Sequence, residues 1–237
     1  GSDPNGTPVK LNDIEKFPFA SEDAFADVGN LTESKSYILG GGTSSPTHGY
    51  RHGGWPATNV IDKYSFSVDG NATDVGDLSV AEYAVGGSHS STHGYRVGGN
   101  EPNNTIEKYS FSSDGNATDV GDLHPEAPNA SYLGNNNGSP THGYQVGGFS
   151  PAGRLEEITK FSFSVDGNST DVGNLLHSGN RTQNMSQASS TDGYIYAHGG
   201  NPPVHDFIQR FSYSSDGDAT DVGDLAIASH NAAGVHN

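Results

Sequence analysis

One short segment occurs five times in this sequence, and its spacing limits what the chain can fold into. The segment reads Ala-Asp-Val-Gly-Asn-Leu at 26–31 and Thr-Asp-Val-Gly-Asp-Leu at 73–78, and its aspartates lie at positions 27, 74, 119, 171 and 221. Successive aspartates are therefore 47, 45, 52 and 50 residues apart. A repeat of about 40–50 residues is typical of one four-stranded propeller blade.

The second repeat unit shows how each blade is expected to be built. Residues 83–85 read as a short apolar first strand, 95–97 as the second, 106–111 as the third and 118–120 as the fourth. The third strand is rich in β-formers, and the Asp114-Gly115 pair that follows it supplies the positive φ of a hairpin turn. Each unit therefore predicts a four-stranded antiparallel sheet.

A glycine pair closes the second strand of four units, at 53–54, 98–99, 147–148 and 199–200. This strand order with its glycine pair resembles the kelch repeat, over nearly the whole chain. Kelch units usually carry Trp in the fourth strand, where this chain has Val28, Val75, Val120, Val172 and Val222. The resemblance implies a β-propeller without assigning the chain to a characterised kelch group.

We expect residues 1–237 to form a single all-β domain, a five-bladed β-propeller of kelch-like blades. The units run approximately over 32–78, 79–123, 124–175 and 176–225, and the closing blade combines 8–31 with 226–237. Strands from both ends of the chain would then share that blade and remove the open sheet edges. A fifth glycine pair is lacking, so either the closing blade has three good strands or the chain belongs to a longer array.

The amino-acid composition limits the classes of partner that the protein can bind. Hydrophobic residues make up only 31% of the 237 residues and glycine contributes 33, as expected for short strands and tight turns. The net charge is −17, and five of the eleven basic residues recur at one repeat position, so no basic patch for nucleic acid or a membrane surface is expected. No apolar run approaches the ~18 residues of a membrane span. With no cysteine, the chain has no disulfide or thiolate site.

The third strands predict the core and a set of ion pairs. Their paired aromatics, such as Tyr109 and Phe111, are expected to be buried between blades in every unit. Lys16, Lys63, Lys108, Lys160 and Arg210 precede the first aromatic, and we expect them to pair across the sheet with the repeated aspartates. Five copies of a Lys–Asp pair indicate a structural role.

Two kinds of turn, one acidic and one carrying a histidine, are candidates for a metal site, but the sequence of neither favours metal binding. The segment 69–74 lacks the sixth-position glycine and the twelfth-position glutamate of an EF-hand, so it reads as a hairpin turn. His48, His93 and His142 read as tight-turn residues before glycine, because Asp192 fills the same place in the fourth unit. We expect no metal and no cofactor.

The stretches in which the units differ are the candidate ligand surface. They are the loops between the second and third strands and those before the first strand, which emerge on the same face of a propeller. The candidate ligand-binding residues on this face are Trp55, Glu101, Phe149, Arg154 and His205. An exposed Trp beside charged side chains is typical of binding surfaces, although loops also diverge simply because nothing constrains them.

Three functions remain open at this point. The first is a non-enzymatic binding or structural module, because the repeat sequence resembles that of virion and tail-type proteins of marine bacteriophages. This resemblance implies a glycan or another surface or virion protein as the partner. It also implies a virion or an extracellular surface as the location. The second is a carbohydrate-binding lectin, with sugar rings stacked on Trp55. A five-bladed glycosidase is the third and least favoured, because Glu33, Glu82, Glu126 and Glu157 show no convergent pattern.

Overall fold

The chain forms an all-β structure of antiparallel sheets. The computed structural model describes residues 11–18, 24–36, 41–99, 103–124, 136–150, 153–176, 186–196 and 206–226. These residues form 18 strands in one two-stranded and four four-stranded sheets, and they contain no helix that could cross a membrane. The predicted all-β class and the repeated four-stranded unit are confirmed.

The strands follow the chain in order from sheet to sheet. The first sheet contains β1 (Leu11–Lys16) and β2 (Ala26–Lys35). The second contains β3 (Gly42–Ser44), β4 (His48–His52), β5 (Thr58–Ser65) and β6 (Thr73–Glu82). The third contains β7 (Gly86–His89), β8 (His93–Val97), β9 (Thr105–Ser110) and β10 (Thr118–Asp122). The fourth contains β11 (Asn136–Gly138), β12 (His142–Ser150), β13 (Gly153–Ser162) and β14 (Thr170–Asn174). The fifth contains β15 (Ser186–Ala188), β16 (Asp192–Tyr196), β17 (Phe207–Ser212) and β18 (Thr220–Asp224).

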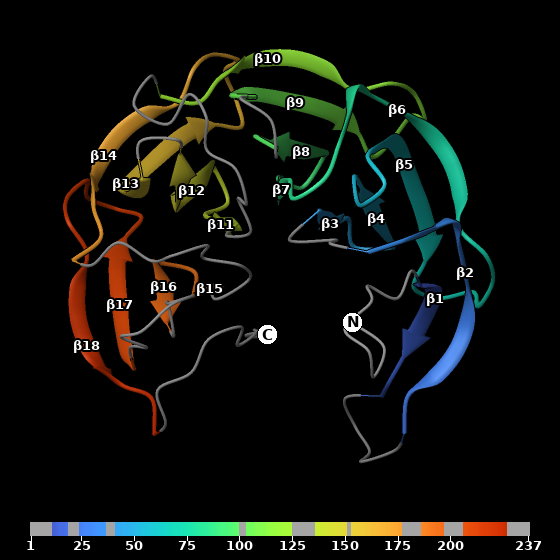
Figure 1. Ribbon diagram of the computed structural model, residues 1–237, viewed down its shortest axis with the longest axis horizontal. Coiled ribbons are helices and arrows are strands. Elements are labelled where there is room, and N and C mark those ends of the chain that lie inside the picture. Colours follow the sequence, from blue (N-terminus) through green and yellow to red (C-terminus); the bar gives the residue numbers. More distant parts are fainter. Residues whose placement is uncertain are drawn as a thin grey trace.

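The five sheets succeed one another along an arc around a common centre (Figure 1). The short strands β3, β7, β11 and β15 lie on the inside of the arc, and β6, β10, β14 and β18 lie on the outside. The sheet β1–β2 and the sheet β15–β18 stand at the two ends of the arc, and the described residues do not close it. The strand expected from the C-terminal end of the chain falls on 227–237, outside the described residues.

The inner strand of the second repeat unit differs from the prediction. Tyr83-Ala84-Val85 was expected as a strand but forms a turn, in which Ala84 has a φ of 55°. The strand β7 begins at Gly86 and reads Gly-Gly-Ser-His. The inner strands of neighbouring sheets lie close together, so that a Cβ at Gly138 of β11 would be 3.5 Å from the Ser88 hydroxyl of β7. Small residues fit that crowded centre, and an apolar pattern does not mark it.

A glycine in each second strand makes room for an aromatic ring of the third strand. A Cβ at Gly94 would lie 2.6 Å from Oη and 2.7 Å from Cε2 of Tyr109. The same ring contact occurs at Gly49, Gly143 and Gly193. The histidines before these glycines begin the strands β4, β8 and β12, and each closes the tight turn that precedes it, since the N–H of Ser45, Ser90 or Ser139 donates to the histidine carbonyl at 2.9 Å. The glycine is needed for close packing inside the sheet.

The aromatic core lies between consecutive sheets. Tyr50 of one sheet packs against Tyr109 and Phe111 of the next, with ring centroids 5.7 and 4.8 Å apart. Tyr109, Phe161 and Phe211 are each only 3% exposed. The prediction that both aromatics of every third strand are buried was wrong for the second one, since Phe66 is 47% exposed. Its counterparts in the next three sheets are partly buried against the core of the junction with the preceding sheet.

The repeated Asp-Val-Gly segment forms a bulge that receives the turn of the next sheet. In the first junction Asn71 Oδ1 accepts the N–H of Asn30 at 3.0 Å, and the N–H of Ala72 donates to the Asn30 carbonyl at 2.8 Å. A side chain at Gly29 would press on the Gly70 carbonyl. We call this arrangement the turn clasp. The same bonds join Asn116 to Asp77, Asn168 to Asp122 and Asp218 to Asn174.

The repeated ion pairs also join neighbouring sheets, which corrects the predicted pairing within a sheet. Lys63 binds Asp114 at 2.8 Å, and Lys108 and Lys160 bind Asp166 and Asp216 at 2.6 Å. Lys16 pairs with Asp69 in the same way. The register places Lys108 opposite Thr118 rather than Asp119, and each repeated aspartate instead accepts the N–H of the glycine two residues later.

Candidate functional site

The structure describes the five predicted ligand residues unequally. Trp55 lies between β4 and β5 and is 43% exposed. Phe149 and Arg154 stand opposite each other in the β12–β13 hairpin, so the chain register does bring these two positions together. Glu101 and His205 lie outside the described residues. Trp55 is therefore the predicted residue around which a site can be built.

Trp55 is held where two sheets meet. Its backbone N–H donates to the Ser36 carbonyl at 2.7 Å, and its carbonyl accepts from the Ser36 N–H at 2.9 Å. Its ring meets Tyr83 edge to face, with centroids 5.1 Å apart and planes at 72°. The N–H of Gly54 donates to the Glu82 carbonyl. The loop before β5 thus packs on the ends of β2 and β6, as expected if these connections share one face.

A charged pair lies beside the Trp55 loop. Lys35 is 8% exposed, and its Nζ donates to the Pro56 carbonyl at 3.0 Å and approaches Glu33 Oε2 at 3.2 Å. Thr58 Oγ1 also donates to Glu33 Oε2, at 2.7 Å. Partial burial raises the pKa of Glu33, but the bonds from Thr58 and Lys35 outweigh it and leave this pKa below its ordinary value. Glu33 therefore carries a negative charge at neutral pH.

We call Trp55, Tyr83 and Glu33 the aromatic corner. It combines an exposed indole, a second ring against it, and a carboxylate whose side chain is 38% exposed. Such a combination can stack a flat apolar face and accept hydrogen bonds from hydroxyl groups. Tyr83 and Glu33 were not predicted as site residues. The signal for both was their position shortly after a repeated leucine, two residues after Leu31 and five after Leu78, in segments where the units begin to differ.

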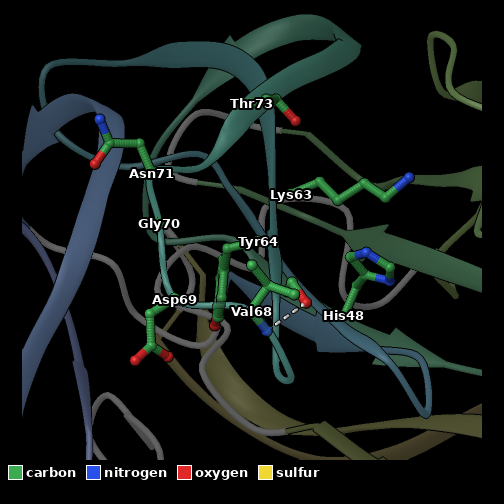
Figure 2. A pocket seen from close by; sticks show the side chains of 9 residues that line it. His48, Lys63, Tyr64, Val68, Asp69, Gly70, Asn71 and Thr73 are labelled. Atoms are coloured by element: carbon green, nitrogen blue, oxygen red, sulfur yellow. Dashed lines mark hydrogen bonds between the residues drawn. The ribbon is translucent and has the colours of Figure 1, made fainter.

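A separate hollow of about 250 Å³ lies at the turn between β5 and β6 (Figure 2). His48, Lys63, Tyr64 and Asp69 are among its lining residues. Asp69 is already paired with Lys16, and the Asn71 side-chain oxygen is bound in the turn clasp. These bonds engage one carboxylate oxygen of Asp69 and the side-chain oxygen of Asn71. No group of three or more metal-binding side chains occurs in the described ranges.

His48, His93 and His52 each lie beside a neighbouring hydroxyl group. His48 and His93 each place Nδ1 2.9 Å from the hydroxyl of the preceding threonine. His52 is fully buried, with Nδ1 3.3 Å from the Tyr109 hydroxyl. Burial lowers the pKa of His52 to about 3, so its ring is neutral at physiological pH.

Two buried carboxylates on third strands contact the second strand of their own sheet and the outer strand of the preceding sheet. Glu107 receives Arg96 Nε at 2.8 Å and the Ser79 N–H at 2.7 Å, and both members of the Arg96–Glu107 pair are fully buried. Asp62 stands at the same position in the second sheet but is one methylene shorter, and it lies 3.8 Å from Arg51. Both carboxylates are engaged across a sheet junction and face no open cavity found among the described residues.

Comparison with protein-family models and with curated proteins found no match to this chain. The argument for function therefore depends on the repeat units and on the aromatic corner.

Proposed function

We propose that this protein is a non-enzymatic binding module that holds a carbohydrate on the aromatic corner. The observation that carries the proposal is the exposed Trp55 ring, which is fixed by two backbone hydrogen bonds and by Tyr83, on a loop that Lys35 and the charged Glu33 bind through Pro56 and Thr58. A rigid aromatic ring loses little conformational freedom when a sugar stacks on it. One such site binds weakly, so a virion or cell-surface setting with several copies would supply avidity.

The proposed architecture is a five-bladed propeller in which the sheet β1–β2 meets the sheet β15–β18. Phe17 of the first sheet is 42% exposed, whereas its counterparts Phe161 and Phe211 are 3% exposed. Tyr194 of the last sheet is only half-buried, whereas its counterparts Tyr95 and Tyr144 are almost fully buried. Ring closure would place these two side chains against each other and cover the exposed part of both.

The ring closure can be tested with spin labels. The chain has no cysteine, so cysteines introduced at Glu15 and Val222 would be labelled uniquely. A closed ring gives one short, narrow distance between the labels in electron–electron double resonance. A broad distribution of long distances would contradict closure.

The sugar-binding proposal is tested on a glycan array with purified chain. Trp55→Ala should abolish a binding signal that Trp55→Phe partly retains, because the stacking surface is reduced but kept. Phe66→Ala is the matched control, since Phe66 is exposed to a similar extent, 47% against 43%, and belongs to no part of the corner. Equal binding by the Trp55→Ala and Phe66→Ala variants, or an array on which the unaltered chain binds nothing, would refute the proposal.

A further inference from the structure

The outer edge of the last sheet carries the receiving half of the turn clasp. Asp221 Oδ1 accepts the Gly223 N–H at 3.0 Å, as its counterparts do in the four preceding sheets. Gly223 keeps the bulge conformation, with a φ of 150°. A Cβ at Gly223, however, would meet nothing within 4 Å among the described residues, whereas the other four bulge glycines press against a turn of the next sheet. Within the described part of the chain, the receiving geometry is thus formed without an occupant.

The side chains around this edge show the same difference. Val222 is 44% exposed, while Val75, Val120 and Val172 are partly buried against the core of the next junction. Arg210 stands where Lys63, Lys108 and Lys160 bind an aspartate of the next turn. It lies instead 4.0 Å from Asp192 of its own sheet. The edge therefore has an apolar residue, a cation and a shaped backbone available to a partner.

The first sheet of this chain does not offer the matching turn. Aligned on the repeated aspartate, Ala24 stands where the other turns have Asn or Asp, so it cannot accept the bulge N–H. Phe25 stands at the place of Ala72 and Ala219, which are 8% and 2% exposed in their junctions. A phenylalanine ring does not fit a site filled by one methyl group, and Phe25 is 63% exposed.

We propose that the edge formed by Val222–Asp224 and Arg210 is a docking site for a turn of sequence Asp-Gly-Asn-Ala-Thr carried by a further repeat unit. The Asn side chain would accept the Asp224 N–H, the following N–H would bind the Asp224 carbonyl, and the turn aspartate would pair with Arg210. Four junctions of this molecule display these contacts. Ring closure by the chain's own first sheet covers the same edge without completing the clasp, so the further unit docks by displacing that sheet from the edge.

The docking is tested with a cyclised hairpin of residues 60–78, which contains a complete turn. It should bind the full chain saturably, as measured by calorimetry, and Asn71→Ala in the hairpin should weaken binding about two- to tenfold. Arg210→Ala in the chain should weaken it by up to about fivefold. Ala72→Phe, which copies the first turn, should remove binding. A hairpin that binds equally well with Ala72→Phe would overturn the proposal.

A second experiment avoids dependence on an isolated hairpin. Asp23→Gly, Ala24→Asn and Phe25→Ala together give the first turn of the chain the clasp residues. Docking on β18 should then raise the melting temperature, or join copies head to tail in a concentration-dependent manner, and Arg210→Ala should diminish either effect. A triple variant that stays monomeric and melts like the unaltered chain, together with a hairpin that does not bind, refutes the proposal. Self-association of the unaltered chain would identify a second copy as the occupant and would also contradict it.

Discussion

Gly94→Ala should destabilise the protein strongly although it adds a single methyl group. The new Cβ would lie 2.6 Å from Oη and 2.7 Å from Cε2 of Tyr109, about 1 Å inside normal contact. Tyr109 is 3% exposed, and its hydroxyl is held 2.5 Å from Thr43 of the preceding sheet. Overpacking costs about 1–3 kcal/mol and loss of that hydrogen bond about 1 kcal/mol, so we expect about 2–4 kcal/mol.

Thermal unfolding and urea titration measure this loss against a matched glycine. For a chain of this size about 2–4 kcal/mol corresponds to a fall of about 4–16 °C in the melting temperature. The control is Gly167→Ala, because a Cβ at Gly167 would meet nothing within 4 Å. This variant should change stability by less than about 0.5 kcal/mol. If the Gly94→Ala and Gly167→Ala variants have the same melting temperature, the close contact with the Tyr109 ring is not the reason for glycine at position 94.

Three further predictions concern the buried junctions. Glu107→Ala should cost about 3–5 kcal/mol in urea unfolding, because it leaves Arg96 buried without its partner; a loss below 1 kcal/mol would show that water reaches Arg96. His52 has a depressed pKa in the folded state, so its contribution to the free energy of unfolding is complete above about pH 6.5 and falls by about 1.4 kcal/mol per pH unit towards pH 3. His52→Val should flatten this fall between pH 6.5 and 4.5. An unchanged slope would exclude His52 as the cause of the fall. Phe161→Ala should cost about 3–5 kcal/mol and the exposed Phe66→Ala less than about 1 kcal/mol, and similar losses would contradict their different burial.

The strands that can be predicted from the sequence are those whose residues differ in polarity from the segments beside them. The third strand is recognisable because Ile106, Tyr109 and Phe111 are β-forming apolar residues next to an Asp-Gly turn. The inner strand is not recognisable, because Gly86–His89 has the composition of a loop. Its strand conformation comes from the crowded centre of the arc, which is a tertiary effect that a local pattern does not contain.

The ion pairs and the candidate site show the same limit. A pattern within one unit suggests Lys108 and Asp119 as cross-strand partners, but the bulge shifts the register and the turn of the next sheet provides Asp166. Trp55 could be predicted because it is unique in the sequence. Glu33 and Tyr83 could not, because the Glu33 bond to Thr58 and the Tyr83 contact with the Trp55 ring join segments that are far apart in the sequence.

The repeated residues of this chain act mainly between sheets rather than within them. The turn asparagine, the bulge glycine and the strand lysine each bind or contact the neighbouring unit. When repeats contact only their neighbours, stability is approximately a sum of unit and junction contributions. Substitution of a repeated residue therefore alters the contacts at a junction between sheets. Trp55 and Glu33 occur once, so they can change without altering the other junctions. Ligand recognition can evolve on the unrepeated residues for this reason, and the contacts between neighbouring sheets depend on the repeated ones.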